Sequence, residues 1–204
     1  MNHVIGVSGH PGAGKTSLIL GLVQALEGAA PIHMDSYERV TRRPIEAIDR
    51  WMKEGADIDA FEFGELDADL LRLKQGLTVE DRFSRRPVTS RKYVLFETQF
   101  GRAHRKTGRH IDLQIWIDVA PDVALARNVK ALLAGFLREP EPAQLAARVR
   151  WLDGYLDNYL ATVHALLAMQ RERVARDADL RLDGSVPLPA MIEAARAGIL
   201  RRLP

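Results

Sequence analysis

The sequence predicts an α/β fold in which helices flank a mostly parallel, five-stranded sheet to give three layers. Short apolar runs, typical of buried strands, alternate with longer runs that are apolar at helical spacing. A glycine-rich loop joins the first strand to the first helix, and acidic residues follow several strands. This alternation is typical of βαβ units, in which a crossover helix joins two parallel strands.

Five compact apolar runs are expected to form the strands of this sheet. Each is short and is bounded by polar, glycine or proline residues, as buried parallel strands usually are. The strands are expected at residues 4–8, 31–34, 93–96, 113–117 and 180–182.

The helices are expected between and after these strands. Gly28 marks the end of the first helix, and Pro121 is well placed in the first turn of another. A later helix carries Trp151, Tyr155 and Tyr159 four residues apart, which is typical of a packed face. The expected helices span residues 16–26, 45–54, 65–75, 121–133, 143–173 and 189–201.

The loop after the first strand fits the phosphate-binding pattern G-x-x-x-x-G-K-[ST], since residues 9–16 read GHPGAGKT. Its glycines permit backbone angles that let successive N–H groups point at phosphate oxygens at the start of a helix. Lysine in this pattern contacts the β- and γ-phosphates, and the threonine hydroxyl binds Mg²⁺. The chain is therefore expected to bind ATP or GTP with Mg²⁺. The expected contacts are Gly9, Pro11, Gly12, Ala13, Gly14, Lys15, Thr16 and Ser17.

Two acidic residues at strand ends are candidates for catalysis and metal binding. Ligands of parallel sheets lie beyond the carboxyl ends of the strands, where Asp35 and Glu97 are expected. Asp35 could deprotonate an attacking hydroxyl, or could simply cap a helix. Glu97 could hold Mg²⁺ together with Thr16, or could be a solvated strand end. Asp118 also follows a strand, but Pro121 comes so soon that helix capping is the favoured interpretation.

The acceptor contacts are predicted from weaker signals. Asp57 and Asp59 could accept hydrogen bonds from substrate hydroxyls, or could belong to a turn. The loop at residues 101–110 is rich in basic residues, so Arg102 and Arg105 could bind an anionic acceptor or lie on solvated surface. Arg127 is a candidate for the cation that stabilises the transferring phosphoryl group.

Asp81 and Arg82 resemble the Asp-Arg element of thymidylate kinases. They precede the strand at residues 93–96, whereas those enzymes carry the element after the strand. We therefore give these two residues little weight.

The composition excludes several classes of protein. The chain has 204 residues, enough for a single domain (residues 1–204), and its net charge of +2 does not favour nucleic-acid binding. It has no cysteine, which excludes disulfides and thiolate zinc sites. The first strand follows Met1 closely and apolar runs are short, so neither a signal peptide nor a membrane span is expected. A cytoplasmic protein is expected; its oligomeric state, a homodimer included, is left open.

The order of these segments resembles that of P-loop kinases of the uridine kinase, phosphoribulokinase and pantothenate kinase group. The resemblance rests on the phosphate loop, on MDSYERV at residues 34–40, on DAF at 59–61, on VLFE at 94–97, on WIDV at 116–119 and on DADL at 177–180. It implies a P-loop fold with a mobile helical lid around residues 131–142. It also implies transfer of the ATP γ-phosphate to a hydroxyl group, with Asp35 as base and Tyr37 at a substrate-contact position.

The chain also departs from this group. Uridine kinases carry a Tyr-Asp-x-x-x-His-x-Arg segment before the strand that ends at the glutamate, but residues 80–86 read EDRFSRR. The absence of the histidine and tyrosine argues against uridine or cytidine as the acceptor. The lid keeps Arg127 but has Asn128 and Ala131 where uridine kinases place further arginines.

Three functions from different classes remain open. The favoured one is an ATP-dependent kinase acting on a nucleoside, a sugar phosphate or a related metabolite, with an anionic acceptor suggested by the basic loop. A GTPase switch is disfavoured because none of Asn2, Asn128 and Asn158 precedes a lysine, as a guanine-reading Asn-Lys-x-Asp motif requires. The third is a noncatalytic or regulatory ATP-binding protein derived from the kinase fold.

Overall fold

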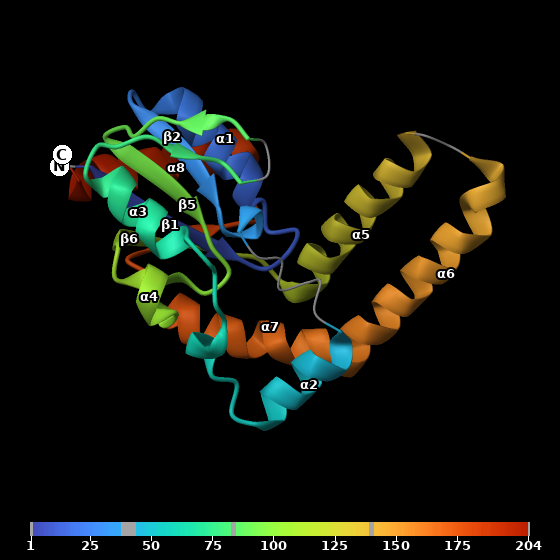
Figure 1. Cartoon of the computed structure of the whole chain (residues 1–204). Helices are drawn as coiled ribbons and strands as arrows, with labels where there is room; N and C mark the ends of the chain where they lie inside the picture. Colours follow the sequence, from blue (N-terminus) through green and yellow to red (C-terminus); the bar gives the residue numbers. More distant parts are fainter. Residues whose placement is uncertain (1, 38–43, 83–84, 139–140, 204) are drawn as a thin grey trace.

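Five parallel strands form the central sheet, in the order β2–β5–β1–β6–β7 (Figure 1). The computed structural model describes residues 2–37, 44–82, 85–138 and 141–203. The expected α/β fold is confirmed, and each of the four strand pairings in this sheet is parallel. Its strands are β1 (His3–Gly9), β2 (Ala29–His33), β5 (Tyr93–Glu97), β6 (Ile111–Asp118) and β7 (Leu180–Asp183). A separate antiparallel hairpin comprises β3 (Val79–Glu80) and β4 (Pro87–Val88).

Helices α1 (Lys15–Ala25) and α8 (Leu188–Arg202) cover one face of the sheet. Leu18 and Leu22 of α1 are fully buried and share one apolar cluster with Ala195 and Ile199 of α8. Burying a leucine side chain completely contributes about 1.5–3 kcal/mol to stability. Because α1 begins directly after the phosphate loop, its packing in this layer fixes the position of the loop.

The other face of the sheet carries a second apolar cluster. It includes buried side chains of α3 (Leu66–Lys74) and a helix α2 (Ile45–Lys53) that supplies Ile48. Tyr93 and Leu95 of β5 point into the first cluster, whereas Val94 and Phe96 point into the second. Burial on both faces explains why this strand reads as an unbroken apolar run rather than an alternating one.

Two helices, α5 (Pro121–Arg138) and α6 (Pro142–Asn158), project from the sheet as a helical arm (Figure 1). The expected lid, residues 131–142, falls within this arm: it includes the last part of α5 and the first residue of α6. Helix α5 continues five residues beyond the expected end at residue 133, past Gly135. A glycine inside a helix costs only about 1 kcal/mol relative to alanine, so it need not end the helix.

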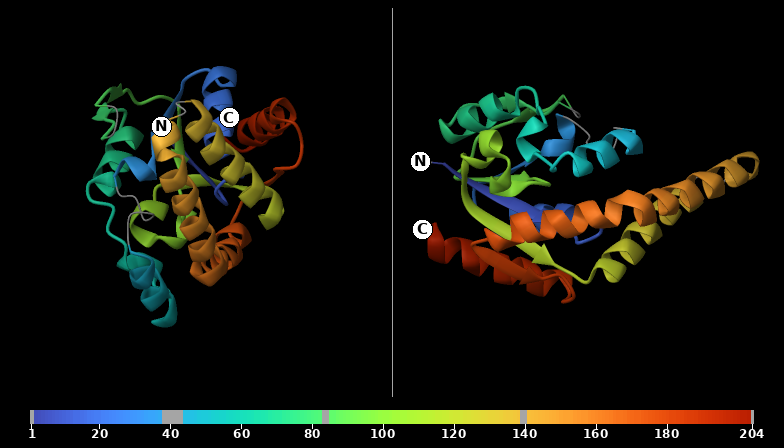
Figure 2. Two further views of the ribbon diagram at one scale, coloured as in Figure 1. Left: turned by 90° about the vertical axis from the view of Figure 1, so that its right-hand side faces the viewer. Right: turned by 90° about the horizontal axis from the view of Figure 1, so that it is seen from below.

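The expected long helix is confirmed, with two interruptions. After α6, the chain continues through a π-helical turn (Tyr159–Val163), α7 (His164–Gln170) and a second π-helical turn (Arg171–Ala175). This continuous rod runs back under the sheet, as the view from below shows (Figure 2). Helix α4 (Arg105–Gly108) lies in the connection between β5 and β6.

Parts of three predicted segments lie outside the described residues. These are residues 38–43 after the candidate base, residues 83–84 of the Asp81 segment and residues 139–140 of the expected lid. Within the described part of the chain, the search for a helix apolar and long enough to cross a bilayer finds none.

Candidate active site

The phosphate loop has the backbone geometry that its glycines predict. Gly12 and Gly14 have φ angles of 83° and 97°, in the left-handed region that favours glycine. Gly14 is the residue before the first turn of α1, so the loop leads directly into the positive end of that helix. A Cβ atom on Gly12 would lie 2.1 Å from the carbonyl oxygen of Ala124 on α5. The loop is thus packed directly against the base of the arm.

Lys15 folds back over this loop. Its Nζ atom donates hydrogen bonds to the carbonyl oxygens of Gly9 and His10, at 3.0 Å and 3.3 Å. Burial lowers the pKa of the Lys15 ammonium, while the negative charges of Glu97 and Asp35 oppose that shift. The lysine charge therefore lies among the phosphate loop and the two carboxylates that the sequence places at strand ends.

Thr16 and Glu97, the two expected metal ligands, are in direct contact. The Thr16 hydroxyl lies 3.2 Å and 3.1 Å from the two carboxylate oxygens of Glu97. Oxygen donors of this kind suit Mg²⁺, which usually takes one or two protein ligands and completes its shell with phosphate oxygens and water. Among the described residues, no group of three or more His, Asp or Glu side chains is arranged to hold a metal ion.

His33 is a member of this site that the sequence analysis missed. Its Nδ1 atom lies 2.8 Å from Glu97, its register partner on β5. The hydrogen bond to Glu97 raises the pKa of His33 although burial opposes the shift. Burial alone would raise the pKa of Glu97, but the His33 hydrogen bond and the Lys15 charge outweigh it and lower that pKa. The strand was expected at residues 31–34, directly before Asp35, but it ends at His33. With the correct end, the strand-end argument would have selected the histidine.

Asp35 lies in a one-turn 3-10 helix, Met34–Ser36, directly after β2. Its carboxylate is exposed and accepts a hydrogen bond of 3.3 Å from Gln99. Since β2 and β5 are neighbours, Asp35 and Glu97 emerge at the same edge of the sheet. The structure therefore brings the candidate base to the edge that carries the phosphate loop and the candidate metal ligands.

The segment after Asp35 is held by a polar network. The Tyr37 hydroxyl donates to Asp69 at 2.8 Å, and Arg82 donates to the same carboxylate at 3.1 Å. Ser36 donates to Asp81 at 3.2 Å. Asp69 is buried, so its charge needs these partners. Asp81 and Arg82, given little weight from sequence, thus lie beside the segment that carries the candidate base.

A cavity of about 530 Å³ lies between α3 and the β3–β4 hairpin and is lined in part by Asp69 and Arg82. Neither Asp35 nor Glu97 lines it. We therefore do not place the acceptor hydroxyl in this cavity.

The structure does not bring Arg102 to the site. Its guanidinium binds the Asp179 carboxylate at 2.7 Å and the carbonyl oxygens of Ile111 and Asp112. Those residues begin β6 or precede β7, at the sheet edge opposite the phosphate loop. The charge run in the sequence could not reveal that this arginine has a carboxylate partner far along the chain.

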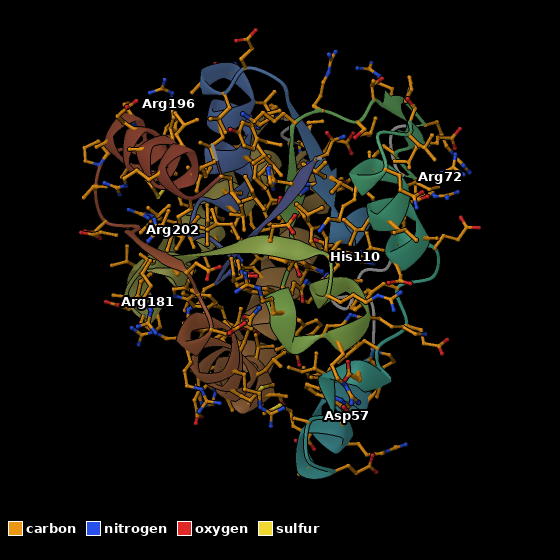
Figure 3. All side chains as sticks on the ribbon, turned by 90° about the vertical axis from the view of Figure 1, so that its left-hand side faces the viewer. Asp57, Arg72, His110, Arg181, Arg196 and Arg202 are labelled. Carbon is orange, nitrogen blue, oxygen red and sulfur yellow. The ribbon has the colours of Figure 1, made fainter. Side chains whose placement is uncertain are left out.

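Arg105, the other arginine expected to bind an anion, pairs with Asp59 through both its backbone N–H and its side chain. Asp57 caps the short turn at Ile58–Ala60 by accepting from the Asp59 backbone, and Figure 3 shows it beside the end of α2. The turn interpretation of Asp57 and Asp59 therefore describes their contacts better than the acceptor interpretation. A loop that looked like an anion site binds this chain's own carboxylates.

The structure also gives contacts for Arg127, the candidate cation on α5, and for Asp118, the candidate helix cap. Arg127 donates to the carbonyl oxygen of Gly184, at 2.8 Å, in the loop after β7. This places its guanidinium beside the β7–α8 loop rather than on Lys15. Asp118, expected to cap α5, pairs with Arg171 of the second π-helical turn at 2.9 Å.

Solved structures that resemble this chain share its fold. A gluconokinase from Sinorhizobium meliloti 1021 matches with a TM-score of 0.53 and 19% identity, over 98% of this chain and 93% of that one. A sugar kinase from Janibacter sp. HTCC2649 matches with a TM-score of 0.53 and 18% identity, over 100% and 97%. A structure described as a possible uridine kinase from Bacillus stearothermophilus matches with a TM-score of 0.51 and 14% identity, over 89% of each chain.

The search of curated proteins returns no match. The family model of the phosphoribulokinase/uridine kinase family matches residues 4–131, which run from β1 through the phosphate loop, Asp35 and Glu97 into α5. That match covers more than half of the chain and the whole edge at which the candidate site is built. The chain therefore belongs to the phosphoribulokinase/uridine kinase family of P-loop kinases.

Proposed function

We propose that this protein transfers the γ-phosphate of ATP to a hydroxyl group of a polyhydroxylated, sugar-type acceptor. The observation that carries the proposal is the convergence of Lys15, Thr16, Glu97 and Asp35 at one edge of the sheet. These are a phosphate-binding cation, two oxygen ligands for a divalent ion and an exposed carboxylate. Phosphoryl transfer needs little more, because its catalysis is mainly positioning and charge stabilisation.

In this proposal each side chain has one task. The Asp35 carboxylate accepts the proton of the acceptor hydroxyl as that oxygen attacks the γ-phosphorus. Lys15 leaves the loop carbonyls and stabilises negative charge on the phosphate oxygens. Thr16 and Glu97 would hold Mg²⁺, which neutralises phosphate charge when bound. His33 positions Glu97 through its 2.8 Å contact.

The acceptor class is inferred from the side chains near Asp35. Ser36, Gln99 and Tyr37 offer hydroxyl and amide groups, and Asp81 adds a carboxylate. Such groups suit the several hydroxyls of a sugar, which both donate and accept hydrogen bonds. The printed names of two structural neighbours, a gluconokinase and a sugar kinase, point to the same class. The basic loop no longer supports an anionic acceptor, because Arg102 and Arg105 bind carboxylates of this chain.

The test is ATP consumption with Mg²⁺ across sugars, sugar acids, sugar phosphates and nucleosides. We expect turnover with a member of the sugar group, lost in Asp35→Asn and kept in Asp49→Asn, an exposed aspartate on α2 paired with Lys53. Turnover with nucleosides alone would contradict the acceptor class. Tight ATP binding with no acceptor phosphorylated would overturn catalysis and favour a regulatory ATP-binding protein instead.

A further inference from the structure

A second cavity, of about 700 Å³, lies beneath the phosphate loop. Its walls come from the long helix, from the start of α5 and from Asp118 and Arg181 on β6 and β7. Trp116, the register partner of Arg181, packs on Val174 and Ala175 of the long helix. The cavity therefore lies on the sheet face away from α1 and α8. Its volume is in the range of small-molecule sites, about 300–1,000 Å³.

This cavity is separate from the proposed active site. Asp35, Glu97 and residues 12–17 do not line it. The one residue that it shares with the phosphate loop is His10, whose side chain forms part of its wall. A molecule bound here would therefore not be lined by Asp35, Glu97 or residues 12–17.

The lining of the cavity combines an apolar floor with positive charge. Leu167, Ala168 and Pro121 contribute apolar surface. The charged side chains in the lining are three arginines and two carboxylates, namely Arg171, Arg176, Arg181, Asp118 and Glu172.

These charges are not balanced. Arg171 and Asp118 pair at 2.9 Å and neutralise each other. Arg181 donates one N–H to the carbonyl oxygen of Ala175, at 2.8 Å. A guanidinium has five N–H donors, so this hydrogen bond uses only one of them. The remaining charged side chains in the lining are Arg176, Arg181 and the single carboxylate of Glu172. Two such arginines in a lining that also has apolar side chains suit a carboxylate attached to an apolar body, because arginine binds carboxylates in a bidentate manner.

His10 connects this cavity to the catalytic lysine. Its Nε2 atom lies 3.1 Å from the carbonyl oxygen of Leu167, and its ring packs edge-on against Trp116. Burial lowers the pKa of His10, and its Nε2–H donates to Leu167 because a carbonyl oxygen can only accept. The His10 carbonyl oxygen accepts from Lys15 at 3.3 Å. Two hydrogen bonds thus link the cavity wall to the phosphate-binding cation.

The long helix changes its winding where it borders the cavity. Tyr159 and His164 flank the cavity at the first π-helical turn, and Arg171 and Ala175 line it at the second. Single π-helical turns inside α-helices occur frequently at functional sites. The first of these turns directly follows α6 at the base of the arm, where Pro121 also lines the cavity.

We propose that this cavity is a regulatory site for a small carboxylate with an apolar body, and that its occupancy changes the affinity of the phosphate loop for nucleotide through His10. The inference goes beyond the proposed function and does not require catalysis. It needs only that the chain bind ATP.

Binding is tested by an NMR titration of phenylacetate into the ¹⁵N-labelled chain saturated with a non-hydrolysable ATP analogue, which blocks the phosphate loop. We expect saturable shifts of the Leu167, Ala168 and Arg171 amides. The double variant Arg176→Gln/Arg181→Gln should weaken binding at least about 10-fold, the loss of one charge-assisted hydrogen bond or more. Absence of saturable shifts at these residues would overturn the carboxylate site.

Two variants keep this test independent of folding defects. Ala168→Phe retains both arginines but fills the cavity from an exposed helix position, and it should abolish the shifts. Arg201→Gln/Arg202→Gln is the matched control, since Arg202 likewise donates to a backbone carbonyl and lies on α8 (Figure 3). Equal weakening in the control and test pairs would mean nonspecific charge attraction and would contradict the proposal.

Coupling is tested by measuring the Kd of ATP with and without saturating phenylacetate. Linkage requires that each ligand change the affinity of the other by the same factor, and we expect a change of at least about 5-fold. A change that disappears in Ala168→Phe supports transmission from this cavity. An unchanged Kd despite saturable binding would overturn the regulatory role.

Discussion

The nucleotide side and the acceptor side of the candidate site are built in different ways. The phosphate loop is a contiguous run, and its Gly12 and Gly14 have the backbone angles that the motif predicts. The acceptor side joins residues far apart, such as Tyr37 to Asp69 and Asp35 to Gln99, which are 32 and 64 positions apart. A short motif can therefore define the first side completely, whereas only the fold assembles the second.

The two sides also differ in how they hold charge. On the nucleotide side, Lys15 donates to loop carbonyls that phosphate oxygens can replace. On the acceptor side, Arg82 and Tyr37 both donate to the buried Asp69. Leaving a buried carboxylate without partners costs several kcal/mol, so this network holds the Tyr37 side chain firmly in place on the acceptor side.

The largest expected effect separates chemistry from nucleotide binding. Asp35→Asn should lower kcat about 10²- to 10⁴-fold, the usual contribution of a general base, because an amide cannot accept the hydroxyl proton. The Kd of ATP should change little, since Asp35 is exposed and is not part of the phosphate loop. Steady-state kinetics and calorimetric titration measure the two quantities. A kcat within a factor of three of the wild-type value would exclude Asp35 as base.

The second prediction concerns the contact between the loop and the arm. Gly12→Ala places a Cβ atom 2.1 Å from the Ala124 carbonyl oxygen, in a residue with φ of 83°. Both effects should lower the free energy of unfolding by about 2–4 kcal/mol and weaken ATP binding, as measured by thermal unfolding and titration. Gly135→Ala on the same arm is the matched control, because its Cβ would meet nothing within 4 Å.

Gly135→Ala should instead stabilise the protein by up to about 1 kcal/mol through helix propensity. If the two alanine variants behaved alike, close packing of α5 on the phosphate loop would not explain the requirement for glycine.

The third prediction concerns the acceptor side alone. Tyr37→Phe removes the hydroxyl that donates to Asp69, which should cost about 1–2 kcal/mol of stability and raise the KM of the acceptor severalfold. The KM of ATP should stay the same. Tyr93→Phe is the control, since that hydroxyl donates to Leu203 far from the site. A rise in the KM of ATP for Tyr37→Phe would show that the two sides are not independent.

The fold and the nucleotide side were predictable because local sequence determines them. Apolar runs buried on both faces, such as β5, identify strands of a parallel sheet, and strand ends then place Asp35 and Glu97 at one edge. Because the end of β2 was predicted one residue too late, His33 was not recognised as a strand-end residue. Short 3-10 turns such as Met34–Ser36 leave no distinct signal in the apolar pattern.

The role of the charged residues was not predictable for a different reason. Arg102 and Arg105 form a basic run, but their partners Asp179 and Asp59 lie 77 and 46 positions away. Composition shows that charges of both signs exist, not which of them pair. The same limit applies to Arg82, whose partner Asp69 became identifiable only once α3 and the β3–β4 hairpin were placed together.

The smallest expected effect tests whether the basic loop is structural. Asp67 accepts from Arg109 at 2.8 Å and from His110 at 2.9 Å. Burial would raise the pKa of the Asp67 carboxyl, but the His110 hydrogen bond and the Arg109 charge outweigh it and lower that pKa. A carboxyl with a lowered pKa stabilises the folded state above its unfolded pKa, and this stabilisation is lost as pH falls through the folded pKa.

Asp67→Asn should therefore lower stability by no more than about 1 kcal/mol at neutral pH, because the pair is partly exposed and solvent screens it. The difference from wild type should shrink toward zero as the pH is lowered into the acidic range, as urea unfolding at a series of pH values can show. Kinetics at neutral pH complete the comparison, since a structural loop should leave the KM of the acceptor unchanged. A stability difference that increases as the pH is lowered, or a raised acceptor KM, would contradict a purely structural role. It would indicate instead that this loop contributes to acceptor binding.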